Sequence, residues 1–412
     1  MSNTLKVVDL VLKESQRIAH EKLSFISTTD LQYDKSFVYQ PNKGPHGQTL
    51  RVREPNQFTR TQGSRIIDVQ DVTETTQDIT VATQDHVAIR FNSAELMQSV
   101  NSTAAFDDLS KNYIEPAIAS FVSGIEADYI AYCTKRTYNV VGTAGTPPTD
   151  LVAVGGARAR LNQCLAPKDG SRFIQADSVT MGGMVNGLKG LFQDSAQIKE
   201  QYREGMMGRT AGFDWYENDR MWTMTNGSDI VGTLAAAAAV TNGGTNITLA
   251  SMSAAPATGA VFTVPGVYAC HPETKQSMGY LQQFVVITGS TTTQEVRPAT
   301  WVSGPKQNLC DANGAAIAVT LFNNTALVPV FHGAASTGYL QNLAYHKEAF
   351  QFITADLPLM DDAHKCQRST KDGLSMRVWQ ASDIVNDQLI MRIDMLYGMA
   401  ALRPAWACRI SN

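Results

Sequence analysis

The chain has 412 residues, of which 17% are charged, and its formal net charge is -4. This length exceeds one ordinary compact core and predicts more than one domain, while the weak negative charge provides no basic footprint for binding nucleic acid along a whole surface. No apolar run approaches the roughly 18 residues of a membrane helix, so we expect no membrane segment. The six cysteines are widely spaced and lack a C-x-x-C pair, which favours reduced thiols over a disulfide framework or a zinc site.

The first 65 residues predict extended elements with little core of their own. Residues 4–23 place apolar residues between charged ones, which predicts an amphipathic arm that needs a surface to lie against. Residues 35–65 predict a projecting hairpin, because the strand-like stretches SFVYQ and QTLRVRE flank the turn-forming stretch PNKGPHG. The hairpin holds one acid, Glu54, and six basic residues: Lys35, Lys43, Arg51, Arg53, Arg60 and Arg65. We therefore expect a locally cationic loop.

A long helix is predicted over residues 106–133. Apolar or small residues recur there at steps of four, and Pro116 suits the first turn of its main part. At 1.5 Å per residue, this rod is about 40 Å long. It carries five acids against the single base Lys111: Asp107, Asp108, Glu115, Glu126 and Asp128.

These acids do not form a catalytic pair on a helix. Glu115 and Glu126 share a face but lie about 16 Å apart along the axis, whereas paired-carboxylate catalysis needs a separation of roughly 5–9.5 Å. An acidic face that is solvated or contacts a partner is the better interpretation.

The remainder of the chain alternates in character. A helix is predicted after Asp150 within a mixed region at 150–224. The composition then changes, and residues 247–302 predict a series of short strands and turns, typical of a small barrel or sandwich inserted into the mixed fold. Strands return in the last sixty residues, at LSMRVWQAS, QLIMRIDMLYG and AWACRI.

No stretch of the sequence favours an enzyme. His346, and His364 with Cys366, are the best metal candidates, but they lack the residue pairing of zinc sites, so structural hydrogen bonding is the preferred interpretation. No G-x-S-x-G elbow or phosphate-binding loop is present. We therefore predict no catalytic, cofactor-binding or metal-binding residue.

The positive features are mechanical. Our hypothesis is that the cationic hairpin of one subunit lies over the acidic rod of the next, with charge setting the register; unrelated solvated faces are the alternative. The predicted subunit-interface residues are Lys35, Lys43, Arg51, Arg53, Arg60, Asp107, Asp108, Glu115, Glu126 and Asp128.

Five stretches in order and spacing resemble one family. NYIEPAIASFVSGIEADY, REGMMGRTAGFDWYENDRM, GVYACHPETKQSMGYLQQFVV, NLAYHKEAFQF and RIDMLYGMAALRPAWACRI are similar to the coat proteins of short-tailed phages related to the Salmonella transducing phage. The resemblance covers roughly residues 80–410. It implies an α+β fold of the Hong Kong 97 type with an inserted small Greek-key β-barrel.

The resemblance also implies a domain layout. The arm would be 1–34 and the extended loop 35–65. The peripheral domain would combine 66–149 and 377–412, with the spine helix at 106–133. The axial domain would combine 150–224 and 339–376, and the insertion would be 225–338.

The implied function is that of a major capsid protein in the virion, assembled in the bacterial host cytoplasm. Copies would form hexamers and pentamers of an icosahedral procapsid that matures on DNA packaging, with a scaffolding protein, a portal and packaged DNA bound without sequence specificity. The family has no catalytic residues or cofactors. The alternative of the same fold is an encapsulin-like nanocompartment shell; a carbohydrate-binding or adhesive protein would explain the β-rich middle but not the long helix.

Overall fold

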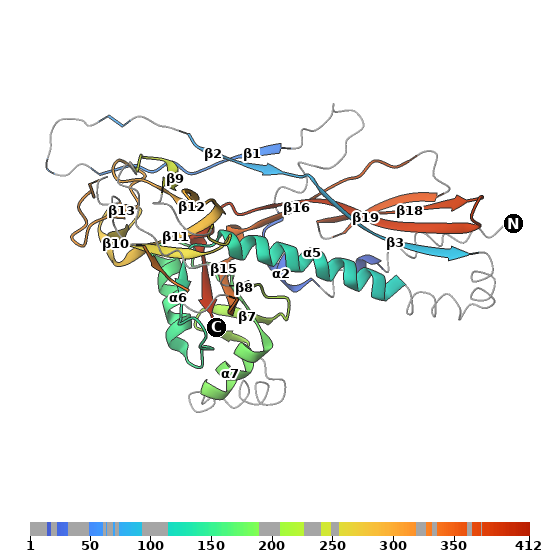
Figure 1. The fold of residues 1–412 in the computed structure, drawn as a ribbon, viewed down its shortest axis with the longest axis horizontal. Coiled ribbons are helices and arrows are strands. Elements are labelled where there is room, and N and C mark those ends of the chain that lie inside the picture. The colour runs from blue at the N-terminus through green and yellow to red at the C-terminus, as the bar shows by residue number, and fades with distance from the viewer. Residues whose placement is uncertain are drawn as a thin grey trace. The chain divides into compact units, whose positions relative to one another are not determined.

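The computed structural model describes residues 15–17, 23–31, 49–60, 63, 69–70, 74–92, 114–188, 207–225, 240–248, 255–318, 327–331, 336–360, 365–371 and 373–412. Two compact units are built from separated segments of the chain (Figure 1). The first combines 1–52, 77–129 and 350–400, and the second combines 53–76, 130–349 and 401–412. Both units mix helices with strands, as the sequence predicts.

The first unit is built on a five-stranded antiparallel sheet. Its path is β16-β19-β18-β17, and β3 also pairs with β19. The strands are β3 (Thr83–Asn92), β16 (Gln351–Ala355), β17 (Lys365–Lys371), β18 (Leu374–Asp383) and β19 (Gln388–Ala400). The predicted strands at LSMRVWQAS and QLIMRIDMLYG are thus confirmed as a neighbouring pair.

The long helix α5 (Glu115–Arg136) begins in the first unit, and the short helix α2 is Ser24–Thr28. Alternate residues of β19, including Met391 and Ile393, are buried because one face of the sheet packs against apolar side chains. The rings of Tyr129 in α5 and Phe352 in β16 are 5.1 Å apart, and Phe352 stacks on Tyr397 at 5.5 Å. The predicted rod is confirmed over its described length, but it continues three residues past the predicted end at 133; residues 106–113 lie outside the described residues.

The second unit contains a seven-stranded sheet with the path β4-β20-β15-β5-β7-β6, and β8 pairs with β15. Its strands are β4 (Val140–Val141), β5 (Arg172–Ala176), β6 (Arg209–Thr210), β7 (Phe213–Glu217), β8 (Thr223–Thr225), β15 (Gly338–His346) and β20 (Ala407–Ser411). Helices α6 (Leu151–Gln163) and α7 (Ser178–Leu188) share its core through Leu161, Met181 and Phe213. The predicted helix after Asp150 is confirmed, because the Asp150 carboxylate accepts from Val152 N at 3.0 Å as an N-cap. Two short 3-10 helices are η4 (Lys347–Ala349) and η5 (Pro404–Trp406).

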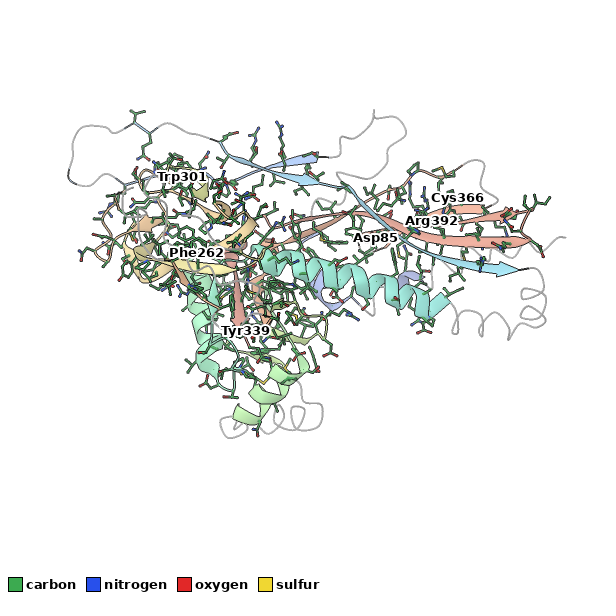
Figure 2. The ribbon with its side chains drawn as sticks, in the orientation of Figure 1. Asp85, Phe262, Trp301, Tyr339, Cys366 and Arg392 are labelled. Atoms are coloured by element: carbon green, nitrogen blue, oxygen red, sulfur yellow. The ribbon has the colours of Figure 1, made fainter. Side chains whose placement is uncertain are left out.

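The β-rich stretch forms a separate six-stranded antiparallel sheet in the same unit. Its path is β13-β10-β11-β12-β9, with β14 on β10. The strands are β9 (Gly244–Thr248), β10 (Val261–Cys270), β11 (Ser277–Gly289), β12 (Thr293–Thr300), β13 (Leu309–Cys310) and β14 (Val328–Pro329). Phe262, labelled in Figure 2, stacks on Phe284 at 5.7 Å, and both rings are fully buried. Closure of these strands into a Greek-key barrel stays a prediction.

Sheet membership near the carboxyl end differs from the predicted layout. The boundary drawn between 376 and 377 falls inside β18, and β17 and β18 are hydrogen-bonded neighbours in the first unit. Conversely, β20 pairs with β15 in the second unit. The difference arises because strand partners are chosen by pairing across long sequence separations, which local patterns do not report.

The strands β1 (Thr49–Arg53) and β2 (Thr76–Thr80) form a two-stranded ribbon. Within the first unit, the Thr49 and Thr80 hydroxyls lie 3.5 Å apart. Within the second, Glu54 N donates to Thr75 O at 2.9 Å, and the Gln70 amide pairs with the Thr59 backbone. The predicted strand QTLRVRE is confirmed, but its described partner is β2; the expected partner at 36–40 and the turn PNKGPHG lie outside the described residues.

Candidate assembly surfaces

The ribbon presents its arginines to solvent, but acids of its second strand accompany them. Arg51 lies 3.4 Å from Asp78, and Arg53 lies 3.6 Å from Glu74. The two arginine side chains remain 76% and 77% exposed. The cationic loop was predicted from residues 35–65, which contain one acid. Glu74 and Asp78 lie beyond that range, so the ribbon is less positively charged than predicted. Arg60 is also exposed, while Lys35 and Lys43 lie outside the described residues.

Glu126 was placed on the acidic face by its position in the rod, and this placement is wrong. Its side chain is fully buried within the subunit. One carboxylate oxygen accepts from Phe25 N at 2.6 Å and from Ser24 Oγ at 3.3 Å, so it holds the start of α2 against α5. Local sequence patterns do not indicate this contact, because the partners are 101 and 102 residues apart.

We expect Glu126→Ala to destabilise the protein by about 1–3 kcal/mol, because it removes the acceptor of a buried backbone N–H. Denaturant unfolding of the purified subunit measures the effect. Asp128→Ala is the matched control on the same helix, since Asp128 is exposed and its loss should leave stability within about 0.5 kcal/mol. Equal stability of the two variants would contradict the docking role of Glu126.

Of the four remaining acids of the rod, the structure describes two, Glu115 and Asp128. Glu115 is the first residue of α5 and half-buried, and Asp128 is exposed. They are thirteen residues apart, about 20 Å along the axis, so the structure does not bring them together. Asp107 and Asp108 lie outside the described residues.

A buried charge network in the first unit was not predicted. Arg377 in β18 faces Asp394 in β19, and its guanidinium donates to both carboxylate oxygens at 3.0 and 2.6 Å. Their side chains are 4% and 0% exposed. Gln84 donates to Asp394 at 3.0 Å, and Arg392, labelled in Figure 2, lies 3.3 Å from it. Both charges are visible in the sequence, but their pairing depends on the strand register.

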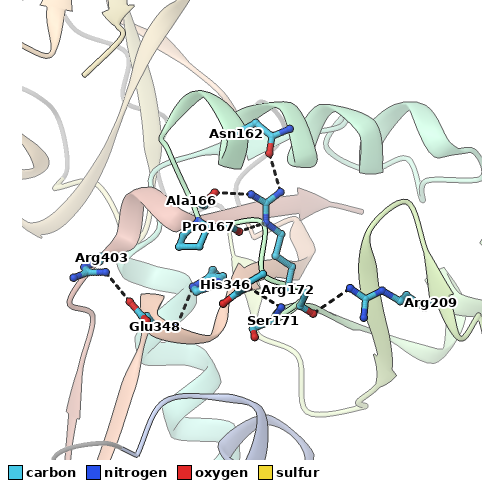
Figure 3. A network of polar contacts seen from close by, with 11 residues as sticks. Asn162, Ala166, Pro167, Ser171, Arg172, Arg209, His346, Glu348 and Arg403 are labelled. Atoms are coloured by element: carbon cyan, nitrogen blue, oxygen red, sulfur yellow. Dashed lines mark hydrogen bonds and ion pairs between the residues drawn. The ribbon is translucent and has the colours of Figure 1, made fainter. Parts of the chain in front are cut away.

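A second network surrounds Arg172, the first residue of β5, and reaches the segment that follows α6 in the second unit (Figure 3). Its guanidinium donates to Asn162 Oδ1, Pro167 O and Ala166 O, between 2.7 and 2.9 Å. These carbonyls follow the helix, so the cation lies at the favourable end of the helix dipole. The arrangement fixes the connection between α6 and β5.

His346 lies in the same region, and both of its ring nitrogens have hydrogen-bond partners within the protein. Its Nε2 lies 3.1 Å from Asp169 Oδ1, and its Nδ1 accepts from Glu348 N at 3.3 Å, which assigns the proton to Nε2. The backbone N–H of Ser171 and the hydrogen bond from His346 lower the pKa of Asp169. His364 lies outside the described residues, and those that are described contain no group of three metal-ligating side chains.

In the described part of the chain, none of the helices is long and apolar enough to cross a membrane.

Comparison with known proteins gives a family match over most of the chain. The model of the P22 coat protein family, described as gene protein 5, matches residues 68–408. No curated protein matches.

Several solved phage structures are similar at low identity. A structure of Mycobacterium phage Che8 matches at 10% identity and a TM-score of 0.48, covering 93% of this chain and 89% of that chain. The capsid of Ralstonia phage GP4 matches at 7% identity and 0.44, covering 95% and 92%. The mature capsid of bacteriophage PhiM1 matches at 12% identity and 0.40, covering 93% and 86%. These scores are below 0.5, so the assignment rests on the family match.

The predicted family and the mixed α+β character of the fold are confirmed, and a phage capsid is favoured over the nanocompartment alternative. Because the family model spans residues 68–408 of the 412, the chain belongs to the P22 coat protein family and is a major capsid protein of a tailed bacteriophage, many copies of which form the icosahedral shell of the virion.

Proposed function

We propose that this subunit forms hexamers and pentamers of a procapsid, together with a scaffolding protein and a portal, and that the shell matures when DNA is packaged. The subunit performs no catalytic step. It encloses DNA without reading its sequence, in keeping with the net charge of -4, which provides no overall attraction for phosphates. Assembly takes place in the bacterial host cytoplasm, in keeping with six free cysteines.

The observation that supports this function best is the exposed ribbon of β1 and β2. Arg51 and Arg53 keep about three quarters of their side-chain surface in solvent, and exposed ion pairs such as theirs contribute little to the stability of one subunit. A ribbon of this kind gains order from neighbouring copies, and many modest contacts together stabilise a shell.

We retain the pairing of this ribbon with the acidic face of α5 in a neighbouring copy, with Glu126 removed from the interface. Within the described residues, Asp128 is the exposed acid of that face, and Asp107 and Asp108 extend the set by sequence. Charge complementarity would set the register and rate of association more than its affinity.

Charge reversal tests this pairing. Arg51→Glu with Arg53→Glu should prevent assembly while leaving the unfolding midpoint of the subunit nearly unchanged, because both side chains are exposed. Adding Asp107→Lys, Asp108→Lys and Asp128→Lys should restore shells, as seen by sedimentation and electron microscopy.

A second rescue separates contacts between copies from contacts within the ribbon. Glu74→Lys with Asp78→Lys restores the charge pairs inside the ribbon only. Rescue by this pair, and not by the lysines at positions 107, 108 and 128, would contradict the proposed pairing of neighbouring copies.

A further inference from the structure

Two adjacent apolar side chains stand in solvent at the turn between β18 and β19. Ile384 is 96% exposed and Val385 is 86% exposed, more than any other large apolar side chain among the described residues. Asp383 fixes the turn, since its carboxylate accepts from Val385 N at 2.9 Å and from Asn386 Nδ2 at 2.6 Å. The side chains of Ile384 and Val385 therefore contribute little to folding of the hairpin, and we call them the apolar tip.

Single exposed apolar residues are ordinary, but two branched neighbours on a fixed turn are typical of an interaction surface. The turn is ordered before binding, so docking of the tip costs little conformational entropy. The partner available in every shell is another copy of the same chain.

The charges beside the tip indicate which surface of that copy it fits. Asp383 and Asp387 flank the apolar pair, and the hydrogen bonds from Asn386 and Val385 lower the pKa of Asp383, so it is ionised at neutral pH. Two tips meeting each other would bring four carboxylates together. The tip therefore suits an apolar surface with a cation beside it.

Such a surface lies on the ribbon, where Phe58 is 58% exposed and Val69 is 82% exposed. Gln70 Oε1 accepts from Thr59 N at 2.9 Å, and its Nε2 donates to Thr59 O at 2.5 Å, which holds the two chain segments together.

This contact brings Val69, the chain neighbour of Gln70, close to Phe58 and Arg60, the two chain neighbours of Thr59. We call Phe58, Arg60 and Val69 the ribbon patch. It combines two exposed apolar side chains with one exposed cation, the complement of the apolar tip.

We propose that the apolar tip of one subunit docks on the ribbon patch of a second copy. This contact goes beyond the pairing of Arg51 and Arg53 with α5, and it assigns Arg60, one of the predicted interface residues, to the apolar tip. It assigns the exposed end of the β18–β19 hairpin a role in joining subunits.

Thiol crosslinking between copies tests the contact directly. In a background with Cys164→Ser and Cys366→Ser, which removes the native thiols that are not buried, Val385→Cys and Val69→Cys subunits are coassembled and treated with a short bismaleimide. We expect covalent dimers in mixed shells and none in shells of either variant alone. Dimers in Val385→Cys shells alone would show contact between tips, and no dimers in mixed shells would show that tip and patch do not meet; either result overturns the proposal.

An independent measurement uses the loss of the apolar surface. Ile384→Asp with Val385→Asp should leave the unfolding midpoint unchanged but raise the protein concentration needed for assembly by about tenfold or more. Ser382→Asp is the matched control, because it adds a charge at an exposed position of the same hairpin and keeps the tip. Assembly of the double variant at the wild-type concentration would contradict the proposal, whatever the charge reversals on the ribbon show.

Discussion

Asp394→Ala is expected to destabilise the subunit by about 3–5 kcal/mol, because it leaves the Arg377 guanidinium buried without its counter-charge. Arg377 donates two hydrogen bonds to this carboxylate, and both side chains are almost completely removed from solvent. Gln84 loses its hydrogen-bond acceptor, and Arg392 loses an ion pair at 3.3 Å. Denaturant unfolding gives the free-energy change, and the temperature dependence of particle yield gives its consequence for assembly.

The matched control replaces both charges. Arg377→Met with Asp394→Val stays closer to the original volumes and removes the desolvation cost of two ions, so it should be far less damaging than Asp394→Ala alone. If Asp394→Ala cost less than about 1 kcal/mol, the pair would not be the buried anchor of the five-stranded sheet.

Deleting residues 225–338 is expected to give insoluble or misassembled protein. The core of the six-stranded sheet also includes Tyr138, Val140, Met224 and Tyr339, which lie outside the deleted stretch and would be exposed. Tyr339 is labelled in Figure 2. The insertion therefore shares its core with the rest of the second unit, and its removal uncovers apolar surface that favours aggregation.

Polar contacts also join the insertion to the rest of the second unit. Gln283 in β11 accepts from Val140 N at 2.7 Å and donates to Val140 O at 3.1 Å, so its amide covers the backbone of the edge strand β4. Arg409, fully buried in β20, donates to Gly259 O at 2.8 Å.

Gln283→Ala is a milder test than the deletion, because it removes only the two hydrogen bonds to the Val140 backbone. It should lower stability by about 1–3 kcal/mol while leaving the subunit soluble. Correctly sized shells from the deletion variant, at wild-type yield, would show that the second unit does not depend on the insertion.

Local patterns predicted most of the secondary structure. The steps of four from Ala117 to Tyr129 predicted α5, and alternation from Leu389 to Tyr397 predicted β19, because these periods reflect one buried face. Asp150 predicted the start of α6 through its capping chemistry.

Long-range partners could not be predicted from the same patterns. The burial of Glu126 depends on α2, about one hundred residues away, and the pairing of Arg377 with Asp394 depends on register. The ribbon arginines were recognised, but Asp78 and Glu74 reach them from a strand whose pairing the turn residues did not indicate. In each case the missing information is which distant segment lies alongside.

The central claim is that this chain is built to be joined to copies of itself. Electron microscopy of the expressed protein, with and without its neighbouring gene products, tests this most directly. We predict closed icosahedral shells of uniform size when a scaffolding protein is present. A protein that stays monomeric under every coexpression condition, with no particles on the grid, would contradict the account.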